Sequence, residues 1–223
     1  MARIDAFLKL GMAQGCSDVH LAVGVPPMLR MHGDLMPIKF REVGDAELES
    51  YITEILTESQ VARFHDGHDL DFSYISGEGG RFRVNVYRKE TGVGATFRSI
   101  PSEIPSLDKL GLPPVVRKLC DYHQGMVLVT GSTGTGKSTT LASMIDLLNS
   151  TRRVNIISLE DPIEFVHRSK NAQVIQRELG THLPSFAEGV RAAMRGDPDI
   201  ILVGELRDAD TIRMAMTAAE TGH

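Results

Sequence analysis

GSTGTGKS, at residues 131–138, is the part of this 223-residue sequence with the clearest structural meaning, because it fits the pattern G-x-x-x-x-G-K-[ST] without a mismatch. The apolar, β-branched run MVLVT at residues 126–130 comes directly before it and predicts a buried parallel strand. Residues 140–149 follow it with apolar side chains at the spacing of a helix face. The pattern therefore lies between a predicted strand and a predicted helix, the setting in which it forms a phosphate-binding loop.

The chemistry of this loop follows from its residue types. Glycines allow the backbone N–H groups to turn inward, and the start of the following helix adds a positive dipole end. Lys137 can then reach the β- and γ-phosphates, and the Ser138 hydroxyl can bind Mg²⁺. The alternative is a turn rich in Gly, Ser and Thr that binds nothing, which the complete pattern and its flanks disfavour.

Composition narrows the class of protein. A net charge of -5 argues against the broad basic surface that sequence-independent nucleic-acid binding needs, so we expect no nucleic-acid partner. Cys16 and Cys120 lie far apart and form no C-x-x-C pair, which predicts neither a disulfide framework nor a zinc site. No apolar run approaches the ~20 residues of a membrane span, and the N-terminus does not resemble a signal peptide. We therefore expect a cytosolic protein without membrane insertion.

The patterns along the chain predict two domains. In residues 1–100 the patterns predict helices at 3–14, 45–56 and 59–64, and Asp45 is the expected N-cap of the second helix. They predict extended segments at 17–23 and 28–32, and an antiparallel meander formed by residues 70–75, 81–87 and 94–100. Two prolines in residues 101–106 predict a linker. Residues 107–223 then place helices at 112–119, 186–194 and 209–219 around buried-type strands at 153–159 and 200–203, which predicts a parallel sheet.

Carboxylates follow both of these strands. Glu205 comes just after the run Ile200–Val203, as in a Walker B element, and Glu160, Asp161 and Glu164 follow the other strand. Acids beside a triphosphate repel it unless they bind metal or accept a proton from the attacking water, so we expect a general base here. The alternatives are a solvated strand end at Glu205 and a plain acidic turn stiffened by Pro162.

Several longer segments resemble one family, the secretion and type IV pilus ATPases. They are the loop at 131–138, SLEDPIEF at 158–165, DPDIILVGELRD at 197–208 and AAETGH at 218–223, the last similar to the start of that family's His box. SDVHL at 17–21, VPP at 25–27 and GRFRVN at 80–85 are most similar to the pilus retraction ATPases. The resemblance implies a PAS-like N-terminal domain (1–100), a linker (101–106), a RecA-like P-loop ATPase domain (107–223) and a homohexameric ring. It also implies further strands and helices after His223.

The resemblance assigns roles to single residues. Lys137 handles phosphate, Glu164 is the catalytic base and Glu205 the Walker B acid, with Ser138 and Glu205 at the metal. The predicted meander carries four arginines, Arg81, Arg83, Arg88 and Arg98. We favour Arg83 and Arg98 as the groups that reach a neighbouring subunit's nucleotide. The alternative is that these arginines only aid solubility. His20 and His32 are expected to be structural. The nucleotide-binding residues are Gly131, Ser132, Thr133, Gly134, Thr135, Gly136, Lys137, Ser138 and Thr139.

The implied function is a Mg²⁺-dependent ATPase that powers type IV pilus retraction and twitching motility. Such a protein acts in the cytoplasm, peripheral to the inner membrane at the pilus base, with an inner-membrane platform protein as partner. The alternatives are a non-catalytic ATP-binding accessory subunit of a pilus motor and an assembly ATPase. A DNA-translocating ATPase is disfavoured by the net charge.

Overall fold

The computed structural model describes residues 2–77, 79–101 and 103–223. The chain forms two compact units, Met1–Ser102 (unit 1) and Glu103–His223 (unit 2). Within the described ranges, every helix is too short or too polar to cross a lipid bilayer.

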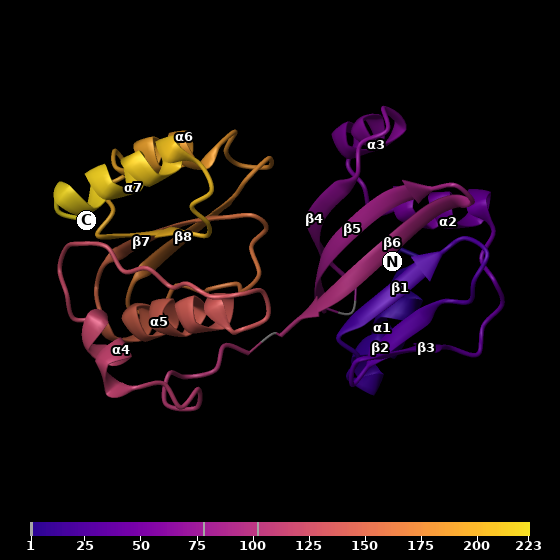
Figure 1. Ribbon diagram of the computed structural model, residues 1–223, viewed down its shortest axis with the longest axis horizontal. Coiled ribbons are helices and arrows are strands. Elements are labelled where there is room, and N and C mark those ends of the chain that lie inside the picture. The colour runs from indigo at the N-terminus through magenta and orange to yellow at the C-terminus, as the bar shows by residue number, and fades with distance from the viewer. Residues whose placement is uncertain (1, 78, 102) are drawn as a thin grey trace. The chain divides into compact units, whose positions relative to one another are not determined.

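Unit 1 is an antiparallel sheet with three helices (Figure 1). Its six strands follow the order β3-β2-β1-β6-β5-β4, and the meander predicted from the sequence is confirmed. The elements are α1 (Asp5–Gln14), β1 (Asp18–Ala22), β2 (Met28–Met31), β3 (Asp34–Pro37), α2 (Asp45–Thr53), α3 (Glu58–His65), β4 (Leu70–Ile75), β5 (Arg81–Lys89) and β6 (Gly92–Ile100).

The two faces of this sheet differ in polarity because side chains alternate along each strand. One face carries Val19, Phe82 and Phe97, which are buried in one core with the helices of unit 1, among them Leu8 of α1 and Ile52 of α2. The opposite face carries charged and polar side chains. Alternation along the strands thus separates an apolar core face from a polar face.

Two details of unit 1 differ from the sequence prediction. Asp45 is not the N-cap of α2, because Gly44 holds that position and the Asp45 carboxylate instead accepts the backbone N–H of Val93 at 3.1 Å. Strand β3 was not predicted, since DLMP shows no apolar alternation; all four of its residues are exposed. Tertiary pairing with β2, rather than local pattern, makes it a strand.

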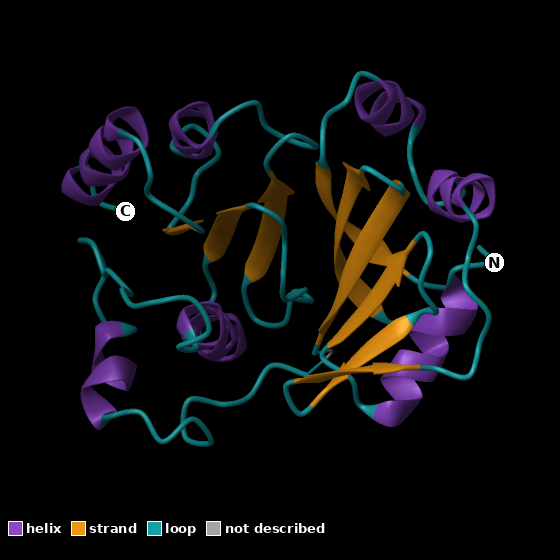
Figure 2. Ribbon diagram, turned by 45° about the vertical axis from the view of Figure 1, so that its right-hand side comes forward, coloured by secondary structure: helices purple, strands orange, loops and turns teal. Residues whose placement is uncertain are grey.

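Unit 2 is a parallel sheet between helices, as Figure 2 shows. The strands follow the order β8-β7-β9, and both pairings are parallel, which confirms the predicted parallel sheet. The elements are α4 (Pro114–Leu119), α5 (Lys137–Thr151), β7 (Asn155–Glu160), β8 (Gln173–Glu178), α6 (Phe186–Ala193), β9 (Ile200–Val203) and α7 (Ala209–Glu220).

Adjacent residues of the strands in unit 2 belong to different cores. Ile156 of β7 is buried in one cluster with α5, together with Leu202 of β9. Ile157 and Val203 belong to a second cluster with Val190 of α6 and residues of α7. A strand covered on both faces needs apolar residues at every position, which is why IILV of β9 was recognisable in the sequence.

The strand predicted at residues 126–130 is wrong. This segment has no regular secondary structure, and the side chains of Met126, Val127 and Leu128 are exposed, Leu128 by 62%. A strand exists only where a neighbour accepts its backbone hydrogen bonds, and among the described residues none does so here. A cavity of about 440 Å³ is lined by this segment and by β9.

Candidate functional site

The phosphate loop leads directly into helix α5, whose first residue is Lys137. Gly131, Gly134 and Gly136 have φ angles of 152°, 81° and 93°, a region that side chains other than glycine rarely adopt. A Cβ atom on Gly131 would also lie 2.8 Å from Thr135 Oγ1. Gly136 is the N-cap, and it has no side chain that could bind the free N–H groups of the first turn. The positive end of this 15-residue helix therefore remains available to an anion.

Two side chains of the loop contact its own backbone. Lys137 Nζ and Thr135 Oγ1 each donate to the carbonyl oxygen of Ser132, both at 2.8 Å. Ser138 is exposed at the same helix start. Lys137 would have to exchange this carbonyl for a phosphate oxygen, which is a stronger acceptor because it is charged. The loop thus holds its lysine at the correct end of α5 without burying it.

Glu205 follows β9 at the carboxyl edge of the sheet. Gly204 N–H donates to the Leu159 carbonyl at 2.8 Å, and a Cβ atom on Gly204 would lie 3.1 Å from that oxygen and 3.3 Å from Glu160 Cα. The chain after β9 therefore runs close against the end of β7, and a side chain at position 204 would require the backbone to shift. The Glu205 carboxylate forms an ion pair with Arg207 at 3.0 Å.

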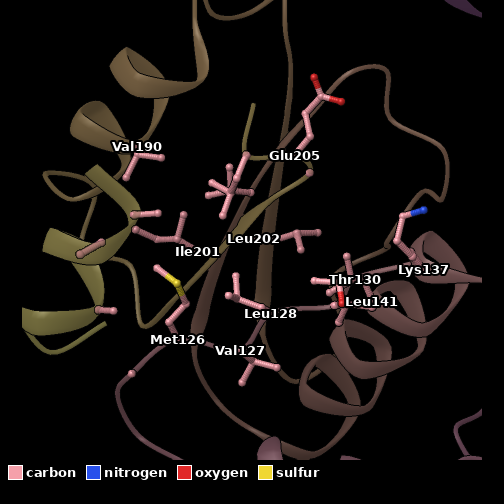
Figure 3. Close-up of a pocket in the computed structure, with 18 of the residues that line it drawn as sticks. Met126, Val127, Leu128, Thr130, Lys137, Leu141, Val190, Ile201, Leu202 and Glu205 are labelled. Atoms are coloured by element: carbon pink, nitrogen blue, oxygen red, sulfur yellow. The ribbon is translucent and has the colours of Figure 1, made fainter. Parts of the chain in front are cut away.

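Lys137 and Glu205 both line the cavity between residues 126–130 and β9. Figure 3 shows these two charged side chains at the edge of a mostly apolar lining that includes Leu128, Leu141 and Ile201. A phosphate group would bind at this charged edge, where the helix dipole and the ammonium group attract it, and not against the apolar residues.

The acidic segment lies at the end of β7. Glu160 Oε1 accepts hydrogen bonds from Ser158 Oγ at 2.7 Å and Gln176 Nε2 at 2.9 Å. Burial raises the pKa of Glu160, which these hydrogen bonds partly oppose, and the negative charge of Glu164 raises this pKa further. The structure therefore brings the predicted base Glu164 close to a second carboxylate. Residues 161–164 are held by β8, since Ile163 N–H donates to Glu178 Oε2 at 3.0 Å.

Two of the predicted arginines share one site on unit 1. The register of β5 and β6 places Arg83 opposite Arg98, on the open face of the sheet. Arg83 binds Asp71 through two hydrogen bonds of 2.6 and 3.2 Å, and Arg98 binds the buried Asp18 at 2.9 Å with its own side chain 65% exposed. Each guanidinium is thus oriented by a carboxylate while facing outward.

The other two arginines are placed differently. Arg81 shares the open face and donates to Ser73 Oγ at 3.0 Å. Arg88 alternates in phase with the buried residues of β5 and so lies on the other face of the strand. Its guanidinium donates to Glu49 Oε1 at 2.9 Å, and its Cζ atom lies 4.5 Å from the ring centroid of Phe64. This cation–π contact gives Arg88 a structural role, and it separates Arg88 from the other three.

The histidines contact their own unit. His20 Nδ1 lies 3.4 Å from Thr96 Oγ1, and burial lowers its pKa. His223 Nδ1 lies 2.8 Å from the Pro198 carbonyl oxygen. Across the described ranges, no three His, Cys, Asp or Glu side chains converge as a metal site would require. A cation here would need oxygen ligands from Ser138, Glu205 and a bound phosphate.

The sequence missed Gln176 and Glu178, which hold the acidic segment. QVIQRE, the sequence of β8, shows neither an alternation of polar and apolar residues nor a long apolar run, so no sequence signal marked this strand.

Known proteins similar to this chain share its architecture. The chain is 46% identical over 220 residues to the type IV pilus retraction ATPase PilT of Pseudomonas aeruginosa, which covers 99% of this chain and 64% of that protein. It is 47% identical over 197 residues to a twitching motility protein of Neisseria gonorrhoeae, covering 88% of this chain and 53% of that protein. A crystal structure of the pilus retraction motor PilT with bound ADP matches all of this chain and 65% of its own, with a TM-score of 0.95 and 43% identity.

The chain therefore spans less than two thirds of the length of each of these relatives. A sequence model of a family described as Type II/IV secretion system protein matches residues 4–223. The family resemblance and the α/β fold predicted from the motifs are confirmed by these matches. Because this match includes nearly every residue, the chain belongs to the Type II/IV secretion system protein family.

Proposed function

We propose that this chain is part of a Mg²⁺-dependent ATPase motor subunit that powers type IV pilus retraction, and so twitching motility, by hydrolysing ATP to ADP and phosphate. The observation that carries the proposal is the glycine-rich loop at the uncapped start of α5, with Lys137 as the first helical residue. Similarity to PilT, whose crystal structure contains ADP, supports a nucleotide as the ligand.

We propose the following domain organisation. Residues 1–100 form a PAS-like N-terminal domain, which the antiparallel sheet with helices on one face supports. Residues 101–106 form the linker, and residues 107–223 belong to a RecA-like ATPase domain. The parallel sheet between helices and the phosphate loop before α5 support this second assignment.

In the proposed reaction, backbone N–H groups of residues 131–139 and the Lys137 ammonium bind the phosphates of ATP. Ser138 and Glu205 would hold Mg²⁺, which would neutralise negative charge on the phosphate oxygens. Glu164 orients the attacking water and accepts its proton. Burial raises the pKa of Glu160, and the negative charge of Glu164 raises it further, so the two acids are electrostatically coupled.

Arg83 and Arg98 are proposed to act on the nucleotide of a neighbouring subunit in a homohexameric ring. Their outward-facing, carboxylate-oriented guanidinium groups support this role, because a planar, permanently charged fork matches phosphate oxygens. The ring would lie in the cytoplasm at the pilus base, peripheral to the inner membrane, and contact an inner-membrane platform protein.

Phosphate release by the full-length protein with and without Mg²⁺ tests the proposal. Lys137→Ala should abolish tight nucleotide binding, whereas Glu164→Gln should retain binding and lose ~10²–10⁴-fold in turnover. Wild-type release no faster than that of both variants would contradict the ATPase function. Tight binding of ATP without turnover would instead favour the non-catalytic accessory subunit.

A further inference from the structure

The segment that carries Glu164 has no regular secondary structure between β7 and β8. It therefore lacks the backbone ladder that fixes a residue within a strand. Catalysis by a general base requires the carboxylate to stay within hydrogen-bond reach of the water it activates. Side chains of β8 provide the missing hydrogen bonds on both sides of Glu164.

Gln176 contacts this segment with both ends of its amide group. Its Nε2 donates to Glu160 Oε1 at 2.9 Å and to the Phe165 carbonyl at 2.8 Å. Its Oε1 accepts the backbone N–H of His167 at 2.8 Å. One side chain thus links the end of β7 to the residue that follows Glu164.

Glu178 holds the residue before Glu164. Its Oε2 accepts the backbone N–H of Ile163 at 3.0 Å, and both residues are buried, with 7% and 8% exposed. Thr181 Oγ1 lies 3.4 Å from Glu178 Oε1, and Glu178 N–H donates to His182 Nδ1 at 2.9 Å. Thr181 therefore helps to orient the carboxylate, which in turn accepts a buried N–H.

We infer that Gln176 and Glu178 are positioning residues for Glu164, because they hold the backbone at Ile163 and Phe165 on either side of it. Two residues apart on one strand, they point to the same face of β8. This inference rests on the proposed role of Glu164. A base whose backbone shifts by about 1 Å can lose ~10²-fold in rate without any change in its chemistry.

The test compares Glu178→Ala with Glu178→Gln in the full-length protein. The glutamine keeps an oxygen that can accept the Ile163 N–H, whereas alanine removes this acceptor. Gln173→Ala is the matched control, since Gln173 lies on the same strand but is exposed. The measurements are kcat, the Kd for a fluorescent ATP analogue, and amide hydrogen exchange of Ile163.

We expect Glu178→Ala to lower kcat by ~10–100-fold, to leave Kd within about twofold, and to speed exchange of the Ile163 amide. Glu178→Gln should restore most of kcat, and Gln173→Ala should match the wild type. A merely structural role would instead change Kd and kcat together. Faster exchange with unchanged kcat would overturn the inference and leave the proposed function intact.

Wild-type protein that binds but does not hydrolyse ATP would overturn the proposed function. The positioning role of Gln176 and Glu178 would then still be tested by amide exchange at Ile163. Equal exchange of the Ile163 amide in Glu178→Ala and the wild type would refute the positioning role. Faster exchange in the alanine variant alone would show that Glu178 fixes the backbone of this segment.

Discussion

The contact between Gly204 and the end of β7 leads to a specific prediction for Gly204→Ala. The added methyl group would lie 3.1 Å from the Leu159 carbonyl oxygen and 3.3 Å from Glu160 Cα, so its obstacles are backbone atoms that cannot rotate away. Relief requires the chain after β9 to move from β7 by several tenths of an ångström. Overpacking of this kind costs about 1–3 kcal/mol of folding free energy, and it displaces Glu205, the next residue.

Gly189→Ala is the matched control for this substitution. Its methyl group would lie 3.1 Å from Leu183 Cδ1 and 3.2 Å from Leu159 Cδ1, the ends of side chains that can rotate. Gly189 lies within α6, where alanine is favoured over glycine by roughly 0.5–1 kcal/mol. We therefore expect Gly189→Ala to change stability by less than about 1 kcal/mol in either direction.

Urea unfolding and phosphate release measure the two consequences together. Gly204→Ala should lower the free energy of unfolding by about 1–3 kcal/mol and turnover by ~10-fold or more, since small displacements of catalytic groups are costly. The reasoning is refuted if Gly204→Ala is as stable and as active as Gly189→Ala.

Three further predictions concern single residues. Glu160→Gln should raise the free energy of unfolding at neutral pH but not at pH 4, as measured by urea unfolding. A carboxyl group with a raised pKa contributes less stability as pH rises through that pKa, so an equal effect at both pH values would contradict a raised pKa of Glu160. Ser185→Ala should cost about 1 kcal/mol, because Ser185 Oγ accepts Glu188 N–H at 3.2 Å as the N-cap of α6, and Ser185→Asp should not. Arg83→Ala should change stability by less than about 1 kcal/mol, since its ion pair with Asp71 is exposed. It should nevertheless lower turnover of the assembled protein by ~10³-fold, and unchanged turnover would refute action of Arg83 on a nucleotide.

The sequence alone was sufficient for features that depend on local chemistry. The glycine-rich loop was predictable because residues other than glycine rarely adopt the φ angles at Gly131, Gly134 and Gly136, and Lys137 begins the helix that follows. Strand β9 and the position of Glu205 followed from an uninterrupted apolar run whose half-buried residues pack against a core on each face of the sheet. The meander of unit 1 followed from alternation between glycine-rich turns.

Tertiary structure decided the features that depend on neighbours distant in sequence. Residues 126–130 have the apolar, β-branched sequence of a buried strand, but no segment in the described part of the chain pairs with them. The more polar segment β8 is a strand because β7 pairs with it. Strand register placed Arg83 beside Arg98. Gln176 and Glu178 became visible as the supports of Glu164 only in three dimensions, because hydrogen bonds across a fold leave no period in the sequence.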